Sequence, residues 1–219
     1  MLNFYWLDFT TKDHPWFYSL ILYTNWCNLR CYWCHNRRLA WWDYNQKKVV
    51  TINTEEFHPK LSEEELRMAI QNEFIDMVIL CWWEFLIYSL QEIEETITWI
   101  KSLNPNVLIR IDTNWTFPEK VKYVKEKKLA DWFAIDIKWP YWNSKYWSTI
   151  SNVIWLPQKA SELLFPKMLE SINIADTMEY TLFRTVQYPI VNEEYFNEIK
   201  QYTTNKLKSP HSFNLFVEL

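Results

Sequence analysis

The chain has 219 residues, a net charge of −4 and 49% apolar residues. This length suffices for one domain with a substantial core, and we expect a single domain over residues 1–219. The charge argues against a polybasic nucleic-acid-binding surface, and the apolar runs are too short and interrupted for a membrane-spanning helix.

Strand-like stretches alternate with helical ones along the chain. Residues 1–16 suggest a short extended cap, and residues 37–61 a long mixed insertion after the first strand. Strands are predicted over residues 17–24, 77–81, 107–112, 133–137, 179–186 and 213–217. Because most of these runs are almost continuously apolar, they favour a parallel sheet covered by helices.

The helices between these strands have recognisable starts. A hydroxyl residue followed three positions later by a carboxylate predicts capping boxes at Ser62, Ser89 and Thr116. Further helices are expected over about residues 159–174 and 192–206. The repeated alternation predicts an α/β fold, an incomplete (β/α)6 partial barrel, with a doubly wound open sheet as the alternative.

Three of the four cysteines, Cys27, Cys31 and Cys34, follow the first strand with C-x3-C-x2-C spacing. Three thiolates hold three corners of a 4Fe–4S cluster and leave one iron open to a ligand, which indicates chemistry rather than a structural cluster. A zinc site that includes His35 and a chance cluster are alternatives. A disulfide fits poorly, because four cysteines and no signal peptide suggest a cytoplasmic protein. The fourth cysteine, Cys81, is expected in the core.

Polar residues collect where the predicted strands end. In parallel α/β folds the active site lies beyond the carboxyl ends of the strands, so these side chains are candidates for one common site. They are Glu84, Asp112, Thr113, Asn114, Asp136, Lys138 and Arg184.

The chain has 0 glycines and 15 tryptophans. Tryptophan stands at turn positions where glycine usually supplies positive φ or close backbone approach: Trp16, Trp26, Trp82, Trp83 and Trp115. We hypothesise that most tryptophans occupy glycine positions, either through a stop codon that the source organism reads as glycine or through deliberate substitution. Trp99, inside a helical pattern, is expected to be a genuine tryptophan.

With these residues the chain resembles the radical S-adenosylmethionine (SAM) enzymes. Within them it most resembles the activating protein of anaerobic ribonucleoside-triphosphate reductase, one of the glycyl-radical-enzyme activases. The resemblance covers nearly the whole chain. It rests on the cysteine triplet with the following His35-Asn36, on Asp112-Thr113-Asn114-Trp115, where the family has Asp-Thr-Asn-Gly, and on Asp136-Ile137-Lys138 and Tyr180-x-x-Phe183-Arg184-Thr185.

The resemblance implies roles for single residues. Cys27, Cys31 and Cys34 would bind a 4Fe–4S cluster, and SAM would bind the open iron. The implied SAM-binding residues are Trp33, Trp82, Trp83, Glu84, Asp112, Asn114 and Lys138, with Thr113 and Asp136 in a cation or SAM corner and Arg184 as a further candidate. Trp33 occupies the family's aromatic position. Trp82-Trp83-Glu84 stands for the family's Gly-Gly-Glu, and Phe85 departs from the proline that usually follows.

The resemblance also implies an anaerobic activity. A flavodoxin or ferredoxin would reduce the cluster, and SAM cleavage would generate a radical on a glycine of the partner reductase. The alternatives are an activase of another glycyl radical enzyme such as pyruvate formate-lyase, a radical SAM enzyme acting on a small molecule, and a non-catalytic zinc-binding module. We expect neither nucleic acid nor membrane as a partner.

Overall fold

A computed structural model describes residues 2–13, 16–24, 27–29, 31, 41–43, 48–50, 60–81, 84–154, 156–187 and 192–215. For residues 41–43, 48–50, 151–153 and 215 it describes the backbone only. Within these ranges, none of the helices has both the length and the apolar character needed to cross a membrane.

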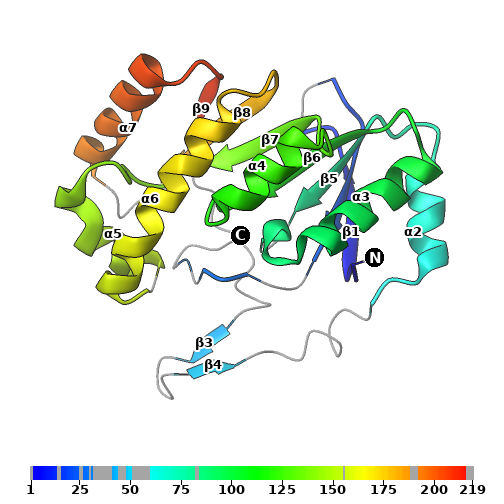
Figure 1. Ribbon diagram of the computed structural model, residues 1–219, viewed down its shortest axis with the longest axis horizontal. Coiled ribbons are helices and arrows are strands. Elements are labelled where there is room, and N and C mark those ends of the chain that lie inside the picture. The colour runs from blue at the N-terminus through cyan, green and yellow to red at the C-terminus, as the bar shows by residue number, and fades with distance from the viewer. Residues whose placement is uncertain are drawn as a thin grey trace.

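A seven-stranded sheet forms the centre of the molecule (Figure 1). Its strands in spatial order are β1 (Trp6–Thr10), β2 (Ser19–Tyr23), β5 (Met77–Cys81), β6 (Leu108–Thr113), β7 (Trp132–Asp136), β8 (Thr181–Gln187) and β9 (His211–Leu215). β1 pairs antiparallel with β2, and every later pairing is parallel. The parallel strands are those predicted from the sequence, with ends shifted by a residue or two, whereas β1 was expected only as an extended cap.

Helices occupy the connections between the parallel strands. They are α2 (Glu63–Ile70), α3 (Leu90–Leu103), α4 (Pro118–Glu126), α5 (Trp147–Ile154), α6 (Gln158–Ala175) and α7 (Glu193–Lys206). The 3-10 helices η1 (Phe85–Ile87) and η2 (Ser144–Tyr146) precede α3 and α5. Within the predicted 37–61 insertion, β3 (Trp41–Asp43) pairs antiparallel with β4 (Lys48–Val50).

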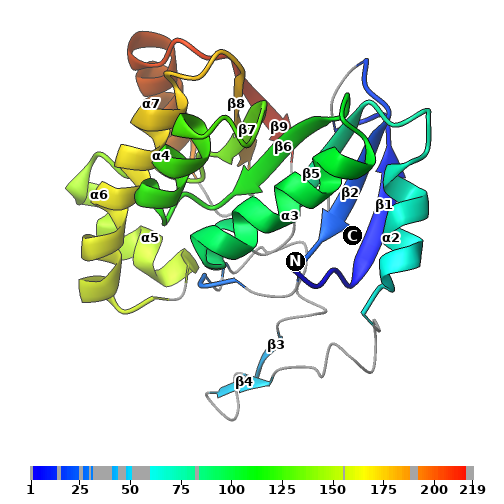
Figure 2. The ribbon, with the colours of Figure 1, turned by 45° about the vertical axis from the view of Figure 1, so that its right-hand side comes forward.

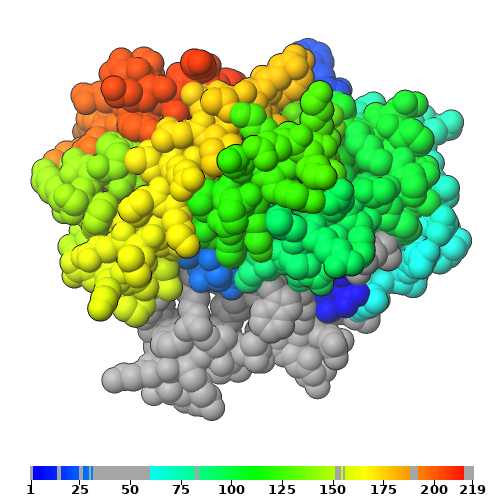
Figure 3. Space-filling model, in the orientation of Figure 1, coloured from blue at the N-terminus to red at the C-terminus, as the bar shows by residue number. Residues whose placement is uncertain are grey.

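The strand order decides between the two predicted architectures. From β1 to β9 the neighbouring strands follow chain order without a reversal, so the sheet lacks the switch point of a doubly wound fold. In both ribbon views α3, α4 and α6 lie over the same face of the sheet (Figures 1 and 2), and in Figure 3 these helices hide the central strands. The fold is the predicted α/β partial barrel.

The two faces of the sheet are covered differently. On the helix side, alternate strand residues are fully buried in the main core: Leu22, Leu80, Ile111, Ile135 and Phe183. On the other side, Ile21, Met77 and Ile79 form a second, smaller cluster to which no residue of a described helix belongs. We call this second side the helix-free face. Because side chains alternate along a strand, the register places Arg110 on this face opposite Ile79.

Two of the three predicted capping boxes are present. Ser62 and Ser89 each accept the backbone N–H of a glutamate three residues later, and that glutamate accepts the serine N–H in return. The box predicted at Thr116 is wrong: α4 begins after Phe117, with Pro118 in its first turn and no side-chain cap. The Thr116 hydroxyl instead donates to Asn114 Oδ1 at 2.9 Å.

Two tryptophans have positive φ angles, as expected for glycine positions. Trp16 has φ 79° and Trp115 has φ 74°. Trp16 is 96% exposed, whereas Trp115 is fully buried and its indole N–H has no hydrogen-bond partner among the described residues. Both positions therefore have the backbone conformation that glycine adopts without a steric penalty.

Candidate functional site

The predicted site residues within the described ranges gather where the parallel strands end. Cys27 follows β2, Glu84 follows β5 and Asn114 follows β6. Asp136 is the last residue of β7, and Arg184 lies opposite it on β8. Since these strands are parallel and adjacent, their carboxyl ends meet at one edge of the sheet.

Cys27 and Cys31 are half-buried thiols at this edge. The Cys27 sulfur accepts two hydrogen bonds, from the backbone N–H of Leu29 at 3.3 Å and from Asn114 Nδ2 at 3.5 Å. Such donors stabilise a thiolate, the form that binds metal. Within the described ranges no three potential metal ligands cluster together, and Cys34 lies outside those ranges. The two described thiols therefore fit two of the three ligands of an iron–sulfur cluster.

Five charged side chains form a continuous network on the helix-free face. Arg110 donates to both oxygens of Asp112, at 2.7 and 2.9 Å. Arg184 joins Asp112 to Asp136, with both contacts at 3.0 Å. Lys138 Nζ completes the network at 2.8 Å from Asp136. Three cations face two carboxylates, and the excess positive charge suits an anionic ligand group.

The Asp136–Arg184 ion pair of this network is favoured in its charged form. Burial by itself would raise the pKa of Asp136, but Lys138 and Arg184 hold that pKa well below its usual range. Burial also opposes the charge of Arg184, yet Asp136 and Asp112 raise its pKa further. The guanidinium of Arg184 lies between the carboxylates of Asp112 and Asp136.

Glu84 is fully buried and connects the loop after β5 to the end of β6. Its carboxylate accepts the hydroxyl of Thr113 at 2.6 Å and the backbone N–H groups of Asn114 and Leu86 at 2.5 and 3.0 Å. Burial raises its pKa to about 7, although these donors and Lys120 oppose the rise. The Thr113 side chain therefore bonds to Glu84 and not to the Asp112–Arg184–Asp136 network.

Sequence reasoning missed three residues of this site. Arg110 is only 1% exposed, and it also donates to the backbone carbonyl of Asp13 at 2.8 Å. Its signal was its place in an apolar strand two residues before Asp112, which puts both on the same face. Asn28 and Thr116, which bond to each other at 2.8 Å, gave no comparable signal because 88 residues separate them.

The remaining predicted site residues, Trp33, Cys34, Trp82 and Trp83, lie outside the described residues, as does His35. Cys81, expected in the core, is half-buried and packs against the smaller hydrophobic cluster on the helix-free face.

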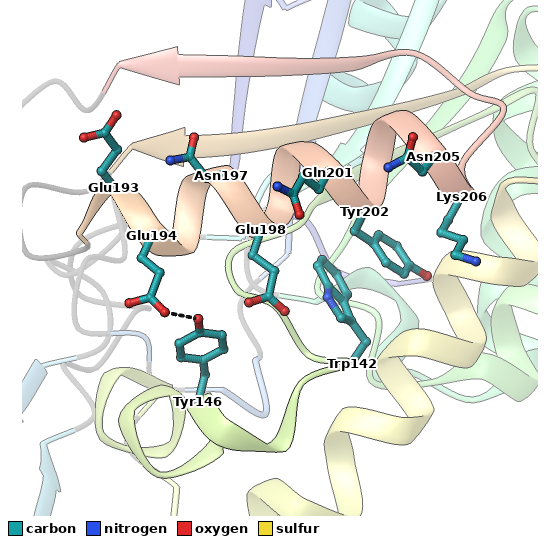
Figure 4. A pocket seen from close by; sticks show the side chains of 10 residues that line it. All are labelled: Trp142, Tyr146, Glu193, Glu194, Asn197, Glu198, Gln201, Tyr202, Asn205 and Lys206. Carbon is teal, nitrogen blue, oxygen red and sulfur yellow. Dashed lines mark hydrogen bonds between the residues drawn. The ribbon is translucent and has the colours of Figure 1, made fainter.

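An open groove of about 660 Å³ lies between α7 and the segment around η2 (Figure 4). Tyr146 donates to Glu194 Oε1 at 2.8 Å across it, and the rings of Trp142 and Tyr202 stack with centroids 3.7 Å apart. None of the predicted site residues that the structure describes lines this groove.

Comparison with known proteins places this site in a family. The profile of the radical SAM superfamily matches residues 21–142, more than half of the chain, from β2 through Lys138. A Methanocaldococcus jannaschii protein, named by inference as a glycyl-radical enzyme activating enzyme, is 26% identical over 132 residues. These residues are 60% of this chain and 48% of the relative, so the aligned part spans about half of the relative's length. The chain belongs to the radical SAM superfamily.

Proposed function

We propose that this protein cleaves SAM reductively at a 4Fe–4S cluster and activates a glycyl radical enzyme, the anaerobic ribonucleoside-triphosphate reductase. The observation that carries the proposal is the common edge of the parallel strands, where the Cys27 thiol lies beside Asn114 and the Arg184 network also ends. A soft metal ligand and an excess positive charge are what a cluster and the carboxylate of SAM require.

In this proposal Cys27, Cys31 and Cys34 hold the cluster. A bound cluster would supply the electron, received from a flavodoxin or ferredoxin, for reductive cleavage of SAM to methionine and a 5′-deoxyadenosyl radical, and this radical would take a hydrogen atom from a glycine of the partner. The residues of this chain need no acid–base role; their task is to bind, orient and exclude water. An oxygen-sensitive cluster makes anaerobic, cytoplasmic surroundings the appropriate setting.

The charged network supplies the proposed attraction for SAM. Arg184 and Lys138 both bond to Asp136, and with Arg110 they give this five-residue network three positive charges against two negative ones. We assign Glu84 a role through the backbone, because its carboxylate accepts three donors from the chain and joins the loop after β5 to the end of β6. A glycine-bearing loop of the partner would enter the open side of the partial barrel, between the edge strands β1 and β9.

The test is anaerobic reconstitution with iron and sulfide, followed by reduction with dithionite in the presence of SAM. We expect a brown protein, an electron paramagnetic resonance (EPR) signal of the reduced cluster and formation of 5′-deoxyadenosine. Replacing Cys27, Cys31 or Cys34 by alanine should abolish all three. Cys81→Ala is the matched control, since Cys81 is also a half-buried thiol but lies outside the triplet, and it should retain all three.

The partner is tested by adding candidate glycyl radical enzymes to the active protein. We expect a glycyl-radical EPR signal with the anaerobic ribonucleotide reductase and none with pyruvate formate-lyase. The reverse pattern would assign the alternative partner, and 5′-deoxyadenosine without any protein radical would favour a small-molecule substrate. A colourless, zinc-loaded protein inert towards SAM would leave only the binding module.

We also infer that Trp16 and Trp115 occupy glycine positions of the functional protein. Both have positive φ, and the buried indole N–H of Trp115 lacks a hydrogen-bond partner. Peptide mass spectrometry of the protein from its natural source tests this inference directly. Peptides with tryptophan at both positions would refute it.

A further inference from the structure

A closed ring of hydrogen bonds joins three side chains next to Cys27. Asn114 Nδ2 donates to Asn28 Oδ1 at 2.9 Å, and Asn28 Nδ2 donates to Thr116 Oγ1 at 2.8 Å. Thr116 Oγ1 closes the ring by donating to Asn114 Oδ1 at 2.9 Å. Each side chain donates once and accepts once within the ring, so the three orientations fix one another.

The orientation of the Asn114 amide is determined independently of the ring. The backbone N–H of Thr116 points at Asn114 Oδ1 at 3.3 Å, and a backbone N–H can only donate. The atom that it faces must therefore be the amide oxygen. The amide nitrogen is then the atom at 3.5 Å from the Cys27 sulfur, so this contact is an N–H···S hydrogen bond.

The Asn114 side chain has no hydrogen-bonding capacity left for another ligand. Its two N–H groups serve Asn28 and Cys27, and its oxygen accepts twice from Thr116. Its backbone is fixed as well, because the N–H of Asn114 donates to the fully buried carboxylate of Glu84 at 2.5 Å. Asn114 was predicted to contact SAM, and the contacts of its amide among the described residues are to Cys27, Asn28 and Thr116.

We infer that Asn114 is a positioning residue that raises the reduction potential of the cluster bound through Cys27, with Asn28 and Thr116 holding its amide at the sulfur. This inference rests on the proposed function. An N–H donor stabilises negative charge on a ligand sulfur, and a cluster gains negative charge when it is reduced. Removal of the donor therefore makes reduction harder.

The experiment is a redox titration of the reconstituted full-length protein without SAM, followed by the EPR signal of the reduced cluster. In Asn114→Ala we expect the equilibrium constant for one-electron reduction to fall several-fold. A tenfold fall corresponds to a midpoint potential lower by about 59 mV. Asn114→Asp should give a larger fall, since it keeps both acceptor contacts with Thr116 but places a carboxylate at the sulfur. Thr116→Val keeps the amide donor but opens the ring, and should give a smaller fall.

Asn104→Ala is the matched control. Asn104 is a half-buried asparagine whose side chain donates one hydrogen bond, to the carbonyl of Ile70 at 3.2 Å, but it ends α3 near the amino end of β6, away from the cysteines. Its midpoint potential should equal that of the wild type.

Any of four results would overturn the inference. One is an Asn114→Ala midpoint that equals that of Asn104→Ala. Another is an Asn114→Ala protein with an unchanged SAM-free midpoint but weaker SAM binding, which would make Asn114 a SAM contact. If Asn114→Ala holds no cluster, the Thr116→Val variant provides the test. A Thr116→Val midpoint potential equal to that of the wild type would refute a role of the ring in the potential. A wild type that assembles no cluster would instead refute the proposed function, and this inference with it.

Discussion

At the scale of single residues, the positive φ angles of Trp16 and Trp115 are the clearest conflict between side chain and backbone. A residue with a Cβ atom in this region costs about 1–2 kcal/mol relative to its preferred conformation. Trp115 adds a buried indole N–H without a hydrogen-bond partner, and an unsatisfied donor of this kind costs about 1–3 kcal/mol. Glycine at these two positions would remove both penalties.

Trp16 allows a clean test, because its side chain is 96% exposed and its removal forfeits almost no packing. We expect Trp16→Gly to exceed Trp16→Ala in free energy of unfolding by about 1 kcal/mol, because only glycine relieves the strain at φ 79°. A glycine variant is ordinarily less stable than the matching alanine variant, because glycine gives the unfolded chain more conformational freedom. Urea denaturation of both variants measures the difference. A Trp16→Ala variant that is more stable than Trp16→Gly would contradict a strained backbone at this position.

The site residues divide by how directly the sequence indicates them. Cys27 was predicted from the spacing of the cysteine triplet, and Asp112 from its place at a strand end and from the family resemblance. Arg110 was not predicted, since an arginine in an apolar strand acquires a meaning only when the register places it beside Asp112 and Asp13. Among the described residues, the proposed cluster ligands therefore have a clearer sequence signal than the side chains that surround them.

At the scale of elements, the helix starts show where a local pattern suffices and where it fails. Ser89 caps α3, and its capping box closes within four residues with contacts of 3.2 and 2.9 Å. Thr116 has the same spacing to Glu119, but its hydroxyl is engaged by Asn28, 88 residues away in the chain, and by the nearby Asn114. A local signal is reliable only when no tertiary partner competes for the same oxygen.

Ser89→Ala should lower the free energy of unfolding by about 1 kcal/mol, because the first turn of α3 loses its side-chain acceptor. Ser102→Ala, on the same helix, is the control. The exposed Ser102 hydroxyl donates only to the carbonyl of Trp99, and its loss should change stability by less than about 0.5 kcal/mol. Equal effects of the two substitutions in thermal or urea unfolding would argue against the capping box.

At the scale of the whole molecule, Arg184 connects three neighbouring strands on the helix-free face. From β8 its guanidinium reaches Asp112 on β6 and Asp136 on β7, and its side chain is 19% exposed. Without this cation the two carboxylates would face each other in a largely dehydrated place. The network therefore stabilises the same sheet edge at which the proposed cofactors bind.

Arg184→Gln should cost about 3 kcal/mol in free energy of unfolding, as expected when one partner of a largely buried ion pair is removed. Lys145→Gln is the control for loss of a positive charge. Lys145 pairs with Glu194 at 2.7 Å, but the pair is exposed, so its loss should cost at most about 1 kcal/mol. The measurement is urea unfolding at low salt, because guanidinium ions would screen such ion pairs. Similar losses of unfolding free energy in both variants would contradict a structural role of Arg184.

The sequence by itself determined the alternation of strands and helices, the cysteine triplet and the polar residues at the strand ends. These follow from local periodicity and spacing, which a single chain displays directly. Only the tertiary structure decided that the strands follow chain order in one partial barrel, that Arg184 separates Asp112 from Asp136, and that Asn114 is directed at Cys27. Those contacts join residues up to 87 positions apart, and which distant side chains meet depends on strand register and loop closure.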